Sequence, residues 1–164
     1  MRLERIRDVD LPALAAFLGA ADLTTSGLDA PAVRLWVERD ATGAIVGSTG
    51  FELSADGRDA LIRSVAVAET DRARGRGTGL ARFALAEAGS AGADHAWLFS
   101  RRSGPFWQRL GFAPAGRDEL ARVLAQTQQV RLFTETGQLE REVAWSRSLA
   151  DPAQRSRAGN ASRS

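Results

Sequence analysis

The stretch "ETDRARGRGTGLARFALAEAG", residues 69–89, alternates arginine with glycine and then continues as an apolar pattern. It follows the apolar run "ALIRSVAV", residues 60–67, which predicts a buried strand. The apolar positions after the glycines have helical spacing: Leu80, Phe83, Ala84 and Ala88. A glycine-rich turn between a strand and a helix can point backbone amides inward, and the unpaired amides of the first helical turn add partial positive charge. The stretch therefore predicts a phosphate-binding loop, in which Arg72, Arg74 and Arg76 add charge at the rim.

Two common nucleotide-binding patterns do not fit this loop. The Walker pattern ends in Gly-Lys-Ser/Thr, and the chain contains no lysine. A dinucleotide-binding fold has its glycines in the first strand-helix crossover and an acidic residue about twenty positions later. Here the loop follows the fourth predicted strand, and the residues around Trp97 are apolar. A solvated turn remains an alternative for an isolated glycine-rich loop.

The rest of the chain divides into further strand and helix patterns. We expect strands at residues 3–7, 34–40, 44–54, 60–67, 95–100, 111–116 and 140–149, and helices at residues 11–21, after the glycine loop, at 104–110 and at 117–126. This order describes an α/β (α+β) fold, a mixed central sheet with helices on both faces. We expect residues 1–149 to form one domain and residues 150–164 a disordered polar tail.

Composition restricts the chemistry. The chain has 164 residues, 44% of them hydrophobic, which suits a single core. Cysteine is absent, which excludes disulfides, a thiolate nucleophile and sulfur-ligated metals. His95 is the only histidine, which excludes a multi-histidine metal site. It begins a predicted strand at an edge position and is expected to be a surface or helix-packing residue rather than a catalyst. All 22 basic residues are arginine, which removes lysine Schiff-base chemistry.

Charge and hydropathy bear on location and partners. The net charge of +2 is too small to indicate nucleic-acid binding. No apolar run approaches the length of a membrane span, and the first ten residues are charged. We therefore expect a soluble, cytoplasmic protein with neither nucleic-acid nor membrane partners; a homodimer is compatible with the sequence, although nothing in it requires one.

Two motifs resemble the GCN5-related N-acetyltransferases (the GNAT family). "SVAVAETDRARGRGTGLARFAL", residues 64–85, is similar to the acyl-CoA loop of that family, Gln/Arg-x-x-Gly-x-Gly/Ala after a strand and at a helix start. "FWQRLGF", residues 106–112, resembles its aromatic-rich helix and Leu-Gly-Phe turn. The element order agrees over nearly the whole chain. The resemblance implies a mostly antiparallel central sheet and acetyl-CoA as the acetyl donor, without a metal.

The resemblance also implies the coenzyme-binding residues. Arg74, Gly77 and Gly79 fit the loop pattern, and the register that uses Arg72, Gly75 and Gly77 fits as well. The first register is preferred because it leaves the following apolar residues where the helix packs. The pyrophosphate is then expected on amides from Arg74 to Gly79 and the pantetheine beside residues 61–68. The full set implied for the coenzyme is Val65, Ala66, Val67, Arg72, Arg74, Gly75, Arg76, Gly77, Thr78, Gly79 and Phe106.

One position departs from the family. Many members have a tyrosine four residues before the glycine of the Gly-Phe turn, where it protonates the leaving thiolate. This chain has Trp107 there and no tyrosine at all. Indole cannot replace a phenol as an acid, so the acid would be water, Ser103 or no group. Trp107 is expected either to pack in the core or to contact substrate.

Candidates for the acceptor side come from two strands. Ser48, Gly50 and Glu52 share one strand face, and with Ser64 they would line a groove if Glu52 pairs near Ile62 or Arg63. Glu52 and Ser64 are the catalytic candidates, and Arg63 and Trp107 the substrate-binding ones. Alternatively Glu52 and Arg63 form a structural ion pair, since an arginine in an apolar strand needs a partner.

The expected activity is acetyl transfer from acetyl-CoA to the amine of a small, amino-acid-like molecule, by direct attack. "GFELSADGRDALIRSVAV", residues 50–67, is more weakly similar to the arsenic-resistance N-acetyltransferase branch, which implies that Glu52, Arg63 and Ser64 line the acceptor site. The alternative is a non-catalytic acyl-CoA sensor of the same fold, which the absent tyrosine favours.

Overall fold

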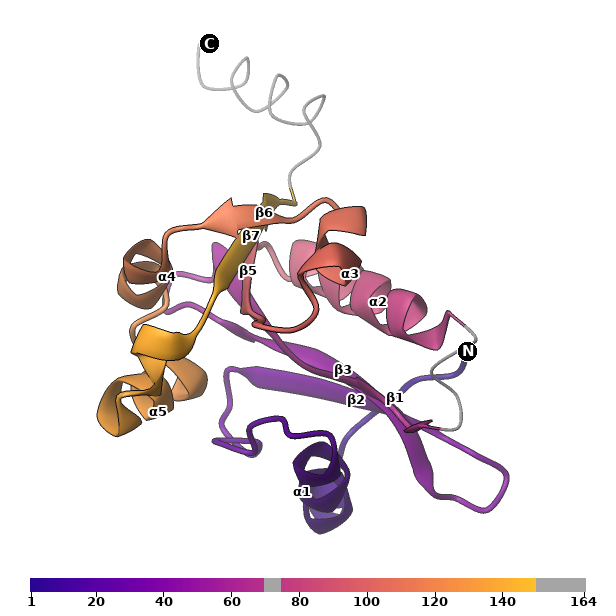
Figure 1. The fold of residues 1–164 in the computed structure, drawn as a ribbon. Coiled ribbons are helices and arrows are strands. Elements are labelled where there is room, and N and C mark those ends of the chain that lie inside the picture. The colour runs from indigo at the N-terminus through magenta and orange to yellow at the C-terminus, as the bar shows by residue number, and fades with distance from the viewer. Residues whose placement is uncertain (70–74, 150–164) are drawn as a thin grey trace, which may run out of the picture.

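The structure is a computed structural model that describes residues 1–69 and 75–149. These residues form one seven-stranded sheet in the order β1-β2-β3-β4-β5-β7-β6, in which β4 and β5 are parallel and the other paired neighbours antiparallel (Figure 1). The strands are β1 (Glu4–Arg5), β2 (Val33–Arg39), β3 (Ile45–Leu53), β4 (Asp59–Val67), β5 (His95–Phe99), β6 (Ala113–Ala115) and β7 (Ala144–Ser148). The expected mixed, mostly antiparallel sheet is thereby confirmed.

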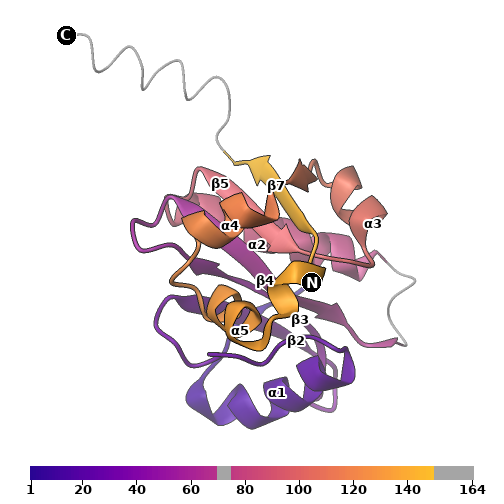
Figure 2. The ribbon, with the colours of Figure 1, turned by 60° about the vertical axis from the view of Figure 1, so that its left-hand side comes forward.

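Helices cover both faces of this sheet. They are α1 (Leu11–Ala20), α2 (Arg76–Ser90), α3 (Gly104–Arg109), α4 (Arg117–Val123) and α5 (Gln128–Thr136), with 3-10 turns at Asp8–Asp10 and Gln138–Arg141. Helices α2 and α3 pack on one face, and α1, α4 and α5 on the other, as the two ribbon views show together (Figure 2). Within the described residues, no helix is long and apolar enough to cross a membrane.

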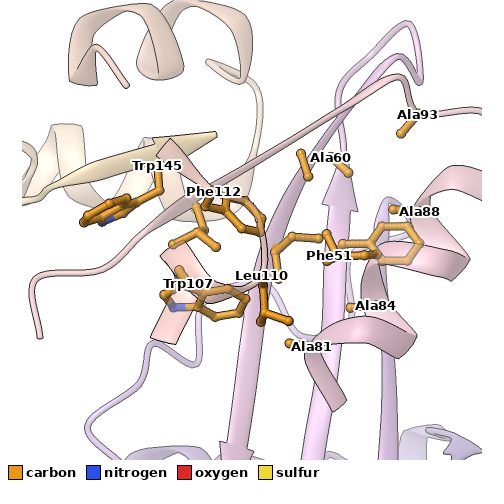
Figure 3. Packing of buried hydrophobic residues seen from close by; sticks show 14 of the residues in the cluster. Phe51, Ala60, Ala81, Ala84, Ala88, Ala93, Trp107, Leu110, Phe112 and Trp145 are labelled. Atoms are coloured by element: carbon orange, nitrogen blue, oxygen red, sulfur yellow. The ribbon is translucent and has the colours of Figure 1, made fainter. Parts of the chain in front are cut away.

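Strand alternation decides which side chain meets which helix. On β2, Trp36 faces α2, whereas Leu35 and Val37 face α1. The α2 face holds the largest cluster, in which Trp107, Phe112 and Trp145 lie together on one side and Phe51 and the alanines of α2 on the other (Figure 3). The small residues on α2 allow the helix to lie close to the sheet, which fixes the place of its N-terminus.

The structure differs from one expectation about strand geometry and from the condition given for the groove. His95 does begin β5, but β5 pairs with β4 on one side and with β7 on the other, so His95 is not on an edge strand. Glu52 lies opposite Leu61, not Ile62 or Arg63. This pairing continues the register of the hairpin, in which Leu53 lies opposite Ala60, and the register changes only between Gly50 and Ser48.

Candidate functional site

The site begins with an irregularity in β4. Ser48 pairs with Ala66 and Gly50 with Arg63, so two residues of β4 lie opposite the single residue Thr49 of β3. One of the two, Ser64, has φ +61°, a left-handed conformation that a non-glycine residue rarely adopts. This extra residue is a β-bulge, and bulges commonly redirect side chains beside functional sites.

Next to the bulge, β4 and β5 separate. Their parallel pairing ends at Leu61 and Trp97, although β4 continues to Val67 and β5 to Phe99. A cavity of about 500 Å³ opens between the diverging strands and extends to the start of α2 and to α3. The predicted site residues that line it are Arg63, Ser64, Val65, Ala66, Val67, Gly77, Phe106 and Trp107. Residues distant in the sequence are therefore brought together at one opening in the sheet.

A glycine turn leads into α2 at one end of this cavity. Gly75 has φ +71° and precedes the helix, and a Cβ atom added to Gly77 would lie 3.7 Å from the Phe106 ring and 3.8 Å from Val67. Gly75, Arg76, Thr78 and Gly79 belong to the same turn without lining the cavity. Arg72 and Arg74 lie outside the described residues, and the choice of loop register depends on them.

The aromatic side of the cavity is formed by α3. Trp107 is buried and makes edge-to-face contacts with Phe106, at 4.9 Å between ring centroids, and with Phe112, at 5.4 Å. Trp107 also lines the cavity, so packing and a contact with bound molecules are compatible with each other. Ser103, considered as a substitute acid, lines the same cavity.

Arg63 is a buried cation on the cavity surface. Its Nε donates to Ser64 Oγ at 3.3 Å and its Nη2 to the Thr24 carbonyl at 3.5 Å. Nη1 lies 3.8 Å from Glu52 Oε2 and has no hydrogen-bond partner among the described residues. Burial lowers the pKa of Arg63, and the nearby Glu52 carboxylate opposes that shift. Arg63 is thus a buried guanidinium with one donor atom that has no hydrogen-bond partner among the described residues, in a residue that lines the cavity.

Glu52 is placed differently from what a catalytic base requires. Both carboxylate oxygens accept the backbone N–H of Gln128, at 2.9 and 3.0 Å, and the side chain is almost completely buried. It does not line the cavity, and its pKa is raised by burial against the opposing effects of the Gln128 amide and Arg63. The ion pair considered as the alternative is therefore present, and Glu52 also binds the first amide of α5.

The expected groove over β3 is filled by packing. Ser48 is fully buried and donates to the Ser64 carbonyl at 2.6 Å. A Cβ atom on Gly50 would lie only 2.2 Å from the Arg34 carbonyl oxygen, so this glycine allows a close approach between strands. Of the four residues expected to line a groove, only Ser64 lines the cavity.

Helix α5 was missed by the sequence analysis. Its N-cap Thr127 accepts the N–H of Val130, and its C-cap Gly137 has φ +74°, so a threonine before and a glycine after the helix were the available signals. Gln129 of α5 lines the cavity and donates to Thr24 Oγ1 at 3.0 Å. The helix therefore contributes a polar side chain to the site and holds, through Thr24, the segment between α1 and β2.

A second, more polar cavity of about 250 Å³ adjoins the first. They share Ala21, Leu23, Phe99, Ser100, Arg102, Ser103 and Gln129. The second cavity also has two carboxylates, Asp22 and Glu142, whereas no described carboxylate lines the first. Glu142 accepts Gln138 Nε2 at 2.9 Å and lies 3.5 Å from Arg101 Nε. Across residues 1–69 and 75–149, no group of acidic or histidine side chains could hold a metal ion.

Comparisons with known proteins agree with this geometry. In fold, the chain is similar to N-acetylglutamate synthase from Neisseria gonorrhoeae in complex with coenzyme A and N-acetyl-glutamate (16% identity, TM-score 0.67), covering 92% of this chain but only 36% of that one. It is also similar to Rv2747 from Mycobacterium tuberculosis in complex with CoA and NLQ (18% identity, TM-score 0.71, 92% and 100% covered). An aminoglycoside 6'-N-acetyltransferase complexed with coenzyme A has 11% identity and a TM-score of 0.67, with 92% and 98% covered.

Sequence comparison gives the family itself. No protein with a curated description matches the chain. The model of the acetyltransferase (GNAT) family matches residues 4–112, more than half of the chain. The matched range contains the bulged strand β4, the start of α2 and helix α3, each of which contributes residues to the lining of the first cavity. The chain belongs to the acetyltransferase (GNAT) family.

Proposed function

We propose that the protein transfers an acetyl group from acetyl-CoA to the amine of a small, carboxylate-bearing, amino-acid-like molecule. The observation that carries the proposal is Arg63: it lines the cavity between β4 and β5, and its buried guanidinium has one donor atom without a hydrogen-bond partner among the described residues. The N. gonorrhoeae structure, similar in fold, contains N-acetyl-glutamate, which is compatible with an acceptor of this class.

In this proposal the coenzyme lies along the first cavity. The amides at the start of α2 bind its phosphates, and Val65 and Val67 lie beside its pantetheine arm. Bound there, acetyl-CoA supplies a thioester whose carbonyl carbon forms a bond to the amine nitrogen while the carbon-sulfur bond breaks. The nitrogen loses one proton and the sulfur gains one. Backbone amides near the bulge orient the thioester carbonyl, an oxyanion-type contribution.

The acceptor occupies the junction of the two cavities. Arg63 pairs with its carboxylate, and Ser64 and Glu52 hold Arg63 in place, Glu52 acting as a positioning residue. Because the first cavity has no described carboxylate, the amine releases its proton toward the second cavity, where Asp22 and Glu142 lie. Trp107 packs beside the thioester and does not donate a proton, so water protonates the thiolate.

A thiol-release assay tests this proposal. The substrates are α-amino acids, each paired with the amine that lacks only the carboxylate, and an amino-acid-like arsenical belongs in the same panel because of the weaker branch resemblance. We expect the carboxylate-bearing member of a pair to react, and Arg63→Gln to raise its KM at least tenfold while the affinity for CoA stays unchanged. Arg58→Gln is the matched control, since it removes the same charge from the exposed hairpin between β3 and β4.

Two outcomes contradict the proposal. Equal turnover of both members of each pair would remove the carboxylate from substrate recognition. Tight CoA binding without thiol release from any amine would favour the sensor alternative, which the presence of Trp107 at the position of the usual acid supports.

A further inference from the structure

A buried carboxylate lies beneath the first turn of α2. Glu38, near the end of β2, is 9% exposed, and its Oε1 lies 2.9 Å from Nη1 of Arg76, the first residue of the helix. Its second oxygen, Oε2, is buried and accepts no hydrogen bond from a described residue. Among the described residues, Arg76 therefore provides the ion pair that compensates this charge.

The strand β3 leaves space for the contact between Glu38 and the start of α2. Gly47 lies opposite Glu38, and a Cβ atom there would be 3.4 Å from Glu38 Oε2 and 3.1 Å from Leu80 Cδ1. Thr49, two residues along β3, donates to the Leu80 carbonyl at 2.7 Å. Two buried polar contacts thus fasten the beginning of α2 to neighbouring strands.

This arrangement changes the role of Arg76. The sequence suggests a free cation at the rim of a phosphate loop, whereas its guanidinium is already bound to Glu38. An ion pair between a rigid strand and the first helical residue limits how the helix can rotate or fray. The amides of Gly77 and its neighbours can bind a phosphate well only while that turn keeps one orientation.

We propose that Glu38 is a positioning residue for the coenzyme: it holds Arg76 against the sheet and so fixes the first turn of α2 in the orientation that binds phosphate. The inference rests on the proposed coenzyme site. Charge alone would give the opposite result, because removal of a carboxylate near an anionic ligand strengthens binding.

Calorimetry with CoA tests the inference. Glu38→Gln keeps the shape of the side chain and removes its charge, and we expect at least a tenfold rise in Kd. In the acetyl-transfer assay, KM for acetyl-CoA should rise by the same factor while kcat stays within twofold. The double variant Glu38→Gln/Arg76→Ala should bind CoA within twofold of Arg76→Ala alone, because Glu38 acts through Arg76.

Glu4→Gln is the matched control. Glu4 lies 3.9 Å from Arg39 and opposite Val37, whose side chain packs against α1, so the same charge is lost on the other face of the sheet. CoA affinity should stay within twofold. A Glu38→Gln variant that binds CoA as tightly as the unmodified protein, or more tightly, overturns the inference. So does a double variant whose rise in Kd equals the product of the rises in the two single variants. Failure of the unmodified protein to bind CoA would instead refute the coenzyme site, and the inference with it.

Discussion

Gly77→Ala separates the stability of α2 from its ligand binding. Gly77 is the second residue of the helix and lines the first cavity. The added methyl would lie 3.7–3.8 Å from Phe106 and Val67, which is ordinary van der Waals contact, so the fold accepts it. Alanine favours a helix over glycine by about 0.5–1 kcal/mol, and a first-turn position should give about 0.5. The melting temperature should therefore rise by about 1–2 °C.

The same methyl occupies the space where the backbone must approach a phosphate. If it displaces one charge-assisted hydrogen bond, the loss is about 1.5–3 kcal/mol, or about 10- to 100-fold in Kd. Calorimetric titration with CoA and a thermal melt measure both quantities on one sample. Gly89→Ala is the control, because Gly89 is in the same helix, a Cβ there meets nothing within 4 Å, and it should stabilise without changing affinity.

Unchanged CoA affinity in Gly77→Ala would show that the first turn of α2 does not contact the coenzyme. A loss of affinity in Gly89→Ala as large as that in Gly77→Ala would show that the helix as a whole, and not the local space, determines binding.

Two further predictions concern buried contacts of β3. Gly50→Ala should lower the free energy of unfolding by about 3 kcal/mol, because the new Cβ would lie 2.2 Å from a backbone oxygen of Arg34, and an unchanged melting temperature would contradict the strand pairing described. For Glu52, burial raises the pKa in the folded protein above 4.5, so the folded state keeps a proton that the unfolded chain releases, and stability falls as pH rises through that window. The unfolding free energy of the unmodified protein minus that of Glu52→Gln should therefore decrease with pH from about 4.5 upward; an increase would mean that Arg63 and the Gln128 amide outweigh burial.

Local patterns predicted most of the fold and one half of the site. Alternation and helical spacing located the strands and four of the helices. The glycine turn before α2 and the aromatic helix that carries Phe106 could be recognised from short motifs, because residues close in the sequence form each of them. Arg63 was also identified correctly as needing a partner, since a charged residue in an apolar strand is costly to bury.

The remaining half depends mainly on tertiary contacts, which local sequence patterns do not reveal. Glu52 binds the backbone amide of Gln128, 76 positions further along, and a backbone amide is the same whatever the residue type. Helix α5 has a threonine N-cap and a C-terminal glycine, but it is short and rich in polar side chains, so the burial of Val130 and of Phe133, which packs on Phe99, stabilises it. The bulge at Ser64 uses a serine where glycine would have marked the turn.

That bulge reverses the alternation of side chains between the two faces of β4. Two residues an even number of positions apart in a regular strand point to the same side, yet Ile62 packs against α2 while Ala66 packs in the cluster of α1. Because of the inserted residue, even-numbered side chains before the bulge and even-numbered side chains after it point to opposite faces of the sheet. Deletion of Ser64 or Val65 would therefore restore one-to-one pairing with Ala66 still opposite Ser48, so the later side chains would keep their faces. What such a deletion removes is the displaced backbone itself, beside the cavity where β4 and β5 separate.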